Sequence, residues 1–162
     1  MFSIEITLGE ILTIFSVLVA AIGLFLTFLQ MRRADRQKRA EFVINMCNQY
    51  LSDSDMMSIH YEIEYDTFEY TENFHQSPKE KQLDKLLLFF DNIAKLWQMR
   101  GITLKDVQIV AYHYLMVYQN KGVKEYLKFL DKWFKRRGVK FAQYAAFREL
   151  GKKLEESYFQ ES

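Results

Sequence analysis

The chain has 162 residues, a formal net charge of +1, and 49% apolar residues. This length allows one folded domain with at most a short appendage, and the apolar content excludes an intrinsically disordered protein. Its single cysteine, Cys47, excludes an intrachain disulfide and fits a reducing compartment.

The first predicted element is a membrane-spanning helix. Ile11 to Leu29 is a run of nineteen residues without a charge, about 28 Å long as a helix, which is close to the hydrocarbon thickness of a bilayer. No Lys or Arg precedes the run and no small-x-small site follows it, so we expect no cleaved signal peptide. Five basic residues follow in RRADRQKR, residues 32–39, and positive flanks stay in the cytoplasm. We therefore expect a single-pass protein of the bacterial inner membrane, with its N-terminus outside and its C-terminal domain cytoplasmic.

Small residues recur along one side of the expected span, at Ser16, Ala20, Gly23 and Thr27. A stripe of this kind lets helix backbones approach each other in lipid, so it favours a homo-oligomer. Oligomerisation matters because one helix cannot enclose a pore, and a channel or membrane lesion would need several subunits.

The remaining chain carries helix signals and no two-residue hairpin turn between alternating runs. Ser77, Pro78 and Glu80 predict a capping box at a helix start, and Thr103 with Asp106 predicts another. After the first helix, which we expect to continue to residue 50, helices are predicted at about 55–68, 78–100, 104–121, 123–137 and 140–157. We predict an all-α fold with one transmembrane helix followed by a compact cytosolic bundle of about five helices. The expected divisions are 1–31 for the tail and span, 32–50 for a basic juxtamembrane helix, and 51–162 for a ligand-binding domain.

Signals for catalysis, metals or cofactors are weak. The chain has no glycine-rich phosphate loop, nucleophile elbow or metalloprotease helix motif. His60 and Glu64 are four residues apart, which we interpret as a surface ion pair because a zinc site needs three or four ligands. His113 is interpreted as a histidine at the edge of the core. We expect no enzyme, no cofactor and no metal.

Charge is segregated along the cytosolic part. Residues 51–80 hold eight acidic residues and one basic residue, whereas residues 121–153 hold eleven basic and three acidic residues. One interpretation is that the two segments pair with each other, within one chain or between subunits. Within the second segment, lysines recur every three or four residues and form one helical stripe, which a solvated helix face would also explain: Lys121, Lys124, Lys128, Lys132 and Lys135.

The end of this stripe is the predicted ligand site. Basic residues crowd the last turn before Gly138, and Lys140 is expected to open the next helix, whose free N–H groups attract anions. Arginine side chains beside a helix N-terminus would make a phosphate cradle, next to which an aromatic side chain can stack on a base. The predicted ligand-binding residues are Lys132, Lys135, Arg136, Arg137, Lys140 and Tyr144. The next candidates are Lys121 with Lys124, and then Lys95 with Arg100.

The stretches LLLFFDNIAKLWQMRGITLKDV and VKEYLKFLDKWFKRRG...FRELGKKLEE, with this order of parts, resemble single-span bacterial proteins with a small helical cytosolic domain. Within that group the chain resembles the small membrane effectors of type III CRISPR systems. The resemblance implies that the cytosolic domain binds a cyclic oligoadenylate, with cyclic tetra-adenylate the first candidate, and no duplex nucleic acid. It also implies that the oligomerised span then damages or depolarises the membrane in antiviral defence, and a four-fold ligand suits a symmetric tetramer.

Two other functions stay open at this point. The first is a membrane-anchored protein-interaction module without a nucleotide ligand, which would dock a partner through its acidic or basic face. The second is a small membrane-bound enzyme.

Overall fold

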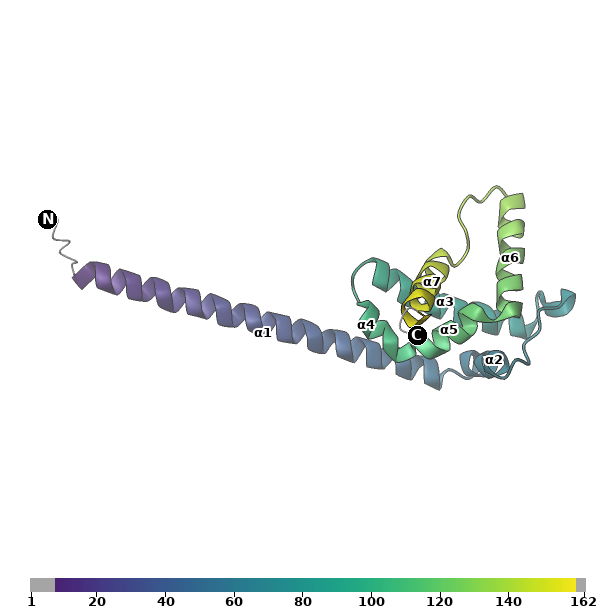
Figure 1. Cartoon of the computed structure of the whole chain (residues 1–162), viewed down its shortest axis with the longest axis horizontal. Helices are drawn as coiled ribbons and strands as arrows, with labels where there is room; N and C mark the ends of the chain where they lie inside the picture. The colour runs from purple at the N-terminus through teal and green to yellow at the C-terminus, as the bar shows by residue number, and fades with distance from the viewer. Residues whose placement is uncertain (1–7, 160–162) are drawn as a thin grey trace. The chain divides into compact units, whose positions relative to one another are not determined.

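The computed structural model describes residues 8–159, and every regular element within that range is a helix (Figure 1). This confirms the predicted all-α fold. The chain divides into two compact units, the first ending at Glu41 and the second beginning at Phe42. In chain order the elements are α1 (Leu8–Ser52), α2 (Ser54–Glu64), η1 (Glu72–Phe74), α3 (Pro78–Gln98), α4 (Leu104–Val107), η2 (Gln108–Val110), α5 (Ala111–Gln119), α6 (Lys121–Arg136) and α7 (Ala145–Phe159).

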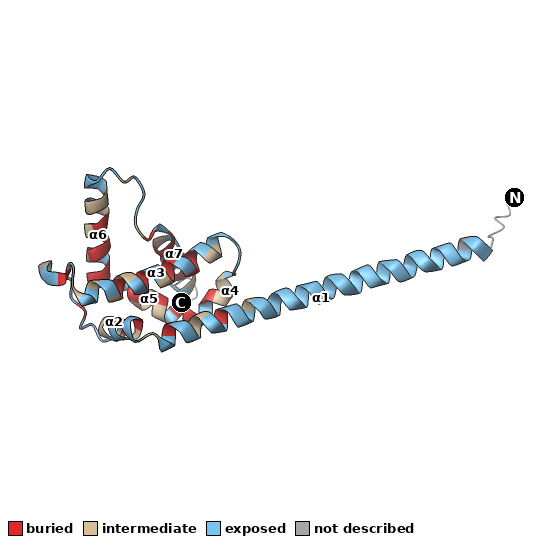
Figure 2. Cartoon of the chain, turned by 180° about the vertical axis from the view of Figure 1, so that it is seen from behind, coloured by how far each residue is buried: buried red, intermediate tan, exposed pale blue. Residues whose placement is uncertain are grey.

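The apolar part of α1 is exposed on every side, as the pale blue ribbon of Figure 2 shows. Phe15, Ile22 and Phe25 are 65%, 59% and 61% exposed. A helix in a soluble core would bury such side chains. The hydroxyls of Thr13 and Thr27 donate to carbonyls one turn earlier, so these polar groups are satisfied within the helix, as a lipid environment requires. In the described part of the chain, α1 alone is long and apolar enough to cross a membrane.

The second unit has one hydrophobic core, and every α-helix contributes at least one buried residue to it. The end of α1 belongs to this core, because Val43 and Tyr50 are 6% and 1% exposed. The five largest fully buried side chains are all aromatic: Tyr50, Tyr114, Tyr126, Phe90 and Phe147. The same helix that carries the apolar span therefore ends inside the core of the helical domain.

Several predicted helix ends are confirmed. The Ser77 hydroxyl accepts the Glu80 N–H at 3.2 Å, with Pro78 as the first residue of α3. Thr103 and Asp106 form the reciprocal capping box of α4. Gly138 follows the end of α6 with a φ of +77°, a conformation that glycine adopts without steric cost.

Other predicted boundaries are wrong. The helix predicted to reach Phe68 ends at Glu64, because Asp66 is left-handed and the N–H groups of residues 67 and 68 return to the Glu62 carbonyl. The single helix predicted over residues 104–121 is divided into α4, η2 and α5. Gly122 was expected to end it but lies inside α6, which Asn120 caps through the Val123 N–H.

The last helix begins at Ala145, whereas the sequence predicted a start near Lys140. Residues 137–144 connect α6 to α7 without a helix (Figure 1). Phe141 lies in this connection and is 69% exposed. Further along, α7 approaches α5 closely at Gly151, where a Cβ atom would lie 2.3 Å from Cδ2 of Tyr118.

Candidate functional site

The predicted basic residues form an exposed group at the end of α6 and in the connection that follows. We call Lys132, Lys135, Arg136, Arg137 and Lys140 the basic cluster; all five are exposed. Among the side chains that the structure describes, none of the five has an acidic partner within ion-pair distance. Arg137 instead makes a cation–π contact, in which its guanidinium lies 3.9 Å from the ring centroid of Trp133.

The acidic segment 51–80 finds its partners elsewhere. Lys85 binds Asp53 at 2.6 Å, and Lys79 binds Glu62 at 2.7 Å. No ion pair among the described residues joins segment 51–80 to segment 121–153. Among the described side chains, the two segments therefore do not neutralise each other within one chain, and the basic cluster keeps its charge available for an external anion or another subunit.

The structure also corrects the predicted phosphate cradle. No helix begins at Lys140, so the free N–H groups expected beside the arginines are missing. Tyr144 is 8% exposed and its hydroxyl donates to Asp84 at 3.0 Å, so its ring does not lie open beside the cluster. The cluster consists of side-chain charges alone, and Tyr144 belongs to a cavity next to it.

This cavity has a volume of about 480 Å³, within the range of small-molecule sites. It lies between the start of α3, one face of α6, and the connection before α7. Its wall is largely aromatic and its floor is polar, with lining residues His75, Gln76, Glu80, Asp84, Tyr126, Phe129, Leu130, Trp133, Phe134, Gln143 and Tyr144. Of these, the sequence pattern had identified only Tyr144 as a site residue.

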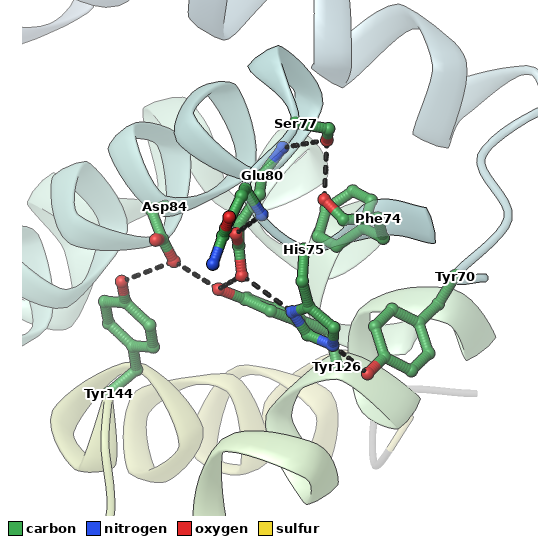
Figure 3. A network of polar contacts seen from close by, with 9 residues as sticks. Tyr70, Phe74, His75, Ser77, Glu80, Asp84, Tyr126 and Tyr144 are labelled. Atoms are coloured by element: carbon green, nitrogen blue, oxygen red, sulfur yellow. Dashed lines mark hydrogen bonds and ion pairs between the residues drawn. The ribbon is translucent and has the colours of Figure 1, made fainter. Parts of the chain in front are cut away.

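Asp84 is held at the floor of the cavity by two tyrosines (Figure 3). Its Oδ1 accepts hydrogen bonds from the hydroxyls of Tyr126, at 2.8 Å, and Tyr144, at 3.0 Å. Burial raises the pKa of Asp84, and the two tyrosine hydrogen bonds oppose that effect. Two donors on one oxygen fix the orientation of the carboxylate, and its other oxygen, Oδ2, receives no hydrogen bond from a described residue.

Glu80 is the second carboxylate of the floor, and both of its oxygens are engaged. Oε1 contacts Nδ1 of His75 at 2.9 Å and accepts from the Tyr126 hydroxyl at 3.3 Å, and Oε2 accepts the Gln76 N–H. Burial acts to raise the pKa of Glu80, but the hydrogen bonds from His75 and Gln76 outweigh it and hold that pKa below its usual range. Nε2 of His75 in turn lies 2.8 Å from the Tyr70 hydroxyl. Glu80 therefore positions His75 in the wall of the cavity and, through it, Tyr70.

Two residues of the cavity have left-handed backbones, Gln76 with φ of +62° and Tyr144 with φ of +54°. Such a conformation costs a bulky residue about 1–3 kcal/mol and persists where surrounding contacts enforce it. Here those contacts are the bond from the Gln76 N–H to Glu80 and the bond from the Tyr144 hydroxyl to Asp84. Asp66 and Arg100 are also left-handed and lie outside the cavity lining, so the strain supports the cavity as a site only together with its carboxylates and aromatic wall.

The cavity and the basic cluster adjoin through Trp133. This side chain lines the cavity and lies under the Arg137 guanidinium. The lining itself includes two carboxylates and no Lys or Arg. Acidic walls repel phosphate, so an anion would be expected on the cluster outside the cavity and a neutral or amine-bearing group inside it.

His60 and His113 form a second polar site, away from this cavity. His60 was expected at the surface but is fully buried, and its Nε2 lies 3.0 Å from Nδ1 of His113 and 3.8 Å from Glu64. Its Nδ1 has no hydrogen-bond partner among the described residues. The described residues include no group of three or more His, Cys, Asp and Glu residues that could hold a metal ion.

Comparison with protein-family models, with curated proteins and with solved structures found no match to this chain. Its function is therefore argued from the basic cluster, the adjoining cavity and the apolar helix α1.

Proposed function

We propose that this protein is a membrane-anchored receptor whose helical domain binds an anionic nucleotide at the basic cluster. The observation that carries the proposal is the gathering of five exposed cations, none in an ion pair with a described residue, beside a cavity with aromatic walls. A nucleotide combines phosphates with an aromatic base, and this site offers cations next to aromatic faces.

A plain solvated helix end explains the cluster less well. Basic residues in the last turn of a helix are stabilised by its dipole, but that effect is confined to the last turn and accounts for one or two charges. The acid nearest in sequence, Asp131, is engaged by Arg148 at 2.7 Å and does not neutralise the cluster. Five like charges that repel one another are more readily understood when a bound anion offsets them.

Cyclic tetra-adenylate is the ligand to test first, because the resemblance of the sequence suggests it. In this proposal α1 lies in the bacterial inner membrane with the helical domain in the cytoplasm, as the basic residues 32–39 favour. The small residues of the span support self-association, and a tetramer would suit a four-fold ligand. Ligand binding would shift the arrangement of subunits, and α1 would carry the change to the bilayer, which is then depolarised as an antiviral response.

The binding step can be tested with matched charge variants of the full chain in detergent. Arg136→Ala with Arg137→Ala should weaken binding of cyclic tetra-adenylate at least about 100-fold, because each charge-assisted contact contributes about 1.5–3 kcal/mol. The control, Lys121→Ala with Lys124→Ala, removes the same charge from the other end of α6 and should change affinity far less. Thermal unfolding should stay close to wild type for both, since all four side chains are exposed.

A protein-interaction module makes a different prediction for the same variants. The lysine stripe from Lys121 to Lys135 runs about 21 Å along α6, and an acidic protein could contact its whole length. Equal loss of binding in both double variants, or no nucleotide binding by the wild type, would contradict the nucleotide proposal and favour this module.

A further inference from the structure

We propose that the cavity beside the basic cluster is a selective subsite for an aromatic base that carries an exocyclic amino group, with Asp84 as the acceptor of its N–H. This inference deepens the proposed function and rests on it, because the base would enter the cavity while the phosphates stay on the basic cluster.

The free oxygen of Asp84 supplies the selectivity. Tyr126 and Tyr144 both donate to Oδ1, so the carboxylate cannot rotate without losing two hydrogen bonds. Oδ2 is left with no donor among the described residues, although Asp84 is half-buried at the cavity floor. Because Oδ2 faces the cavity without a donor from the described residues, a ligand N–H that enters the cavity can donate to it in place of water.

The other carboxylate of the floor does not compete for the same group. Glu80 already accepts from Tyr126 and Gln76 and contacts His75, so both of its oxygens are occupied. Its role is to hold the wall of the cavity. Asp84 is therefore the one lining carboxylate with an unused oxygen, and the acceptor function is assigned to it.

Aromatic side chains supply the stacking faces. Trp133 and Phe134 line the cavity from the last turns of α6, and the rings of His75 and Phe129 lie 4.0 Å apart at their centroids on another part of the wall. Stacking of a base on an aromatic face does not distinguish one base from another. Discrimination must then come from the edge of the base, where an amino group donates to Asp84 and an oxo group would place lone pairs against it.

Adenosine and purine riboside test this directly, because they differ only in the exocyclic amino group and carry no phosphate. In the full chain, Trp97→Phe leaves Trp133 as the single tryptophan, and its fluorescence reports occupation of the cavity. Adenosine should bind at least about ten-fold more tightly than purine riboside, as expected for one hydrogen bond to a charged group. Asp84→Asn should remove this preference, because the amide offers a donor as well as an acceptor. Glu69→Gln, an equal loss of charge at an exposed side chain outside the cavity lining, should keep it.

The two proposals fail separately in this design. Equal binding of adenosine and purine riboside by the protein without a cavity substitution, or no binding of either, would overturn the base subsite whatever the variants do. The phosphate part is read from the difference between adenosine and its 5′-monophosphate, which Arg136→Ala with Arg137→Ala should abolish. If that difference survives the arginine substitutions while the preference for adenosine stands, the proposed phosphate site is wrong and the base subsite is retained.

Discussion

Acidification should destabilise the helical domain through His60. This histidine is fully buried, its Nδ1 has no partner, and Nε2 faces His113 at 3.0 Å and Glu64 at 3.8 Å. Burial and the nearby His113 lower the pKa of His60 to about 4, although Glu64 acts in the other direction. In the unfolded chain the pKa returns to about 6.5. Between these values the unfolded state binds a proton that the folded state does not, so stability falls as the pH falls through this window.

The size of the effect follows from the same two pKa values. One pKa unit corresponds to about 1.4 kcal/mol, so the full window of about 2.5 units amounts to about 3.4 kcal/mol, of which about 2 kcal/mol is lost between pH 7 and pH 5. Denaturant unfolding of the full chain in detergent, measured at several pH values between about 7 and 4.5, gives the slope. Glutamine does not titrate in this pH range. The free energy of unfolding of His60→Gln should therefore fall by about 2 kcal/mol less than that of the wild type over the window. Equal pH dependence in the variant and the wild type would refute this account of His60.

Two further predictions concern packing and topology. Gly151→Ala should lower the free energy of unfolding by about 1–2 kcal/mol, since overpacking against the neighbouring ring costs about 1–3 kcal/mol and the gain in helix propensity returns at most about 1; a raised denaturation midpoint would show that the ring moves aside freely. A reporter at the C-terminus should be active only in the cytoplasm, and changing Arg32, Arg33 and Arg36 together to Glu should scramble its orientation; periplasmic activity in the wild type would reverse the proposed topology.

The fold was largely predictable because its signals are local. The uncharged run within α1, the Ser77 cap with Pro78, and the Gly138 terminator each act through neighbouring residues. The errors occur where distant contacts decide. Gly122 looks like a helix stop, yet it lies in α6 where a Cβ atom would come within 2.9 Å of the Phe68 ring, so tertiary packing explains the glycine.

The candidate site was predictable only in its charged part. The lysine spacing on α6 and the run before Gly138 placed the basic cluster on the surface, where the structure has it. The cavity depends on two hydrogen bonds to Asp84 from residues far away in the chain. Tyr126 lies 42 residues after Asp84, and Tyr144 lies 60 residues after it. The capping pattern predicts that the Glu80 carboxylate returns to the Ser77 N–H, whereas in the structure it bonds to Gln76 and His75, which no sequence pattern indicated.

The central claim is that the basic cluster binds a nucleotide, and calorimetric titration of the full chain in detergent with cyclic tetra-adenylate at low and high salt tests it most directly. The account predicts saturable binding whose affinity falls as salt rises, because several exposed cations contact phosphates and salt screens them. It also predicts that Arg136→Ala with Arg137→Ala flattens this salt dependence as it weakens binding. Folded wild-type protein that releases no heat at either salt concentration, or binding that salt does not alter, would contradict the claim.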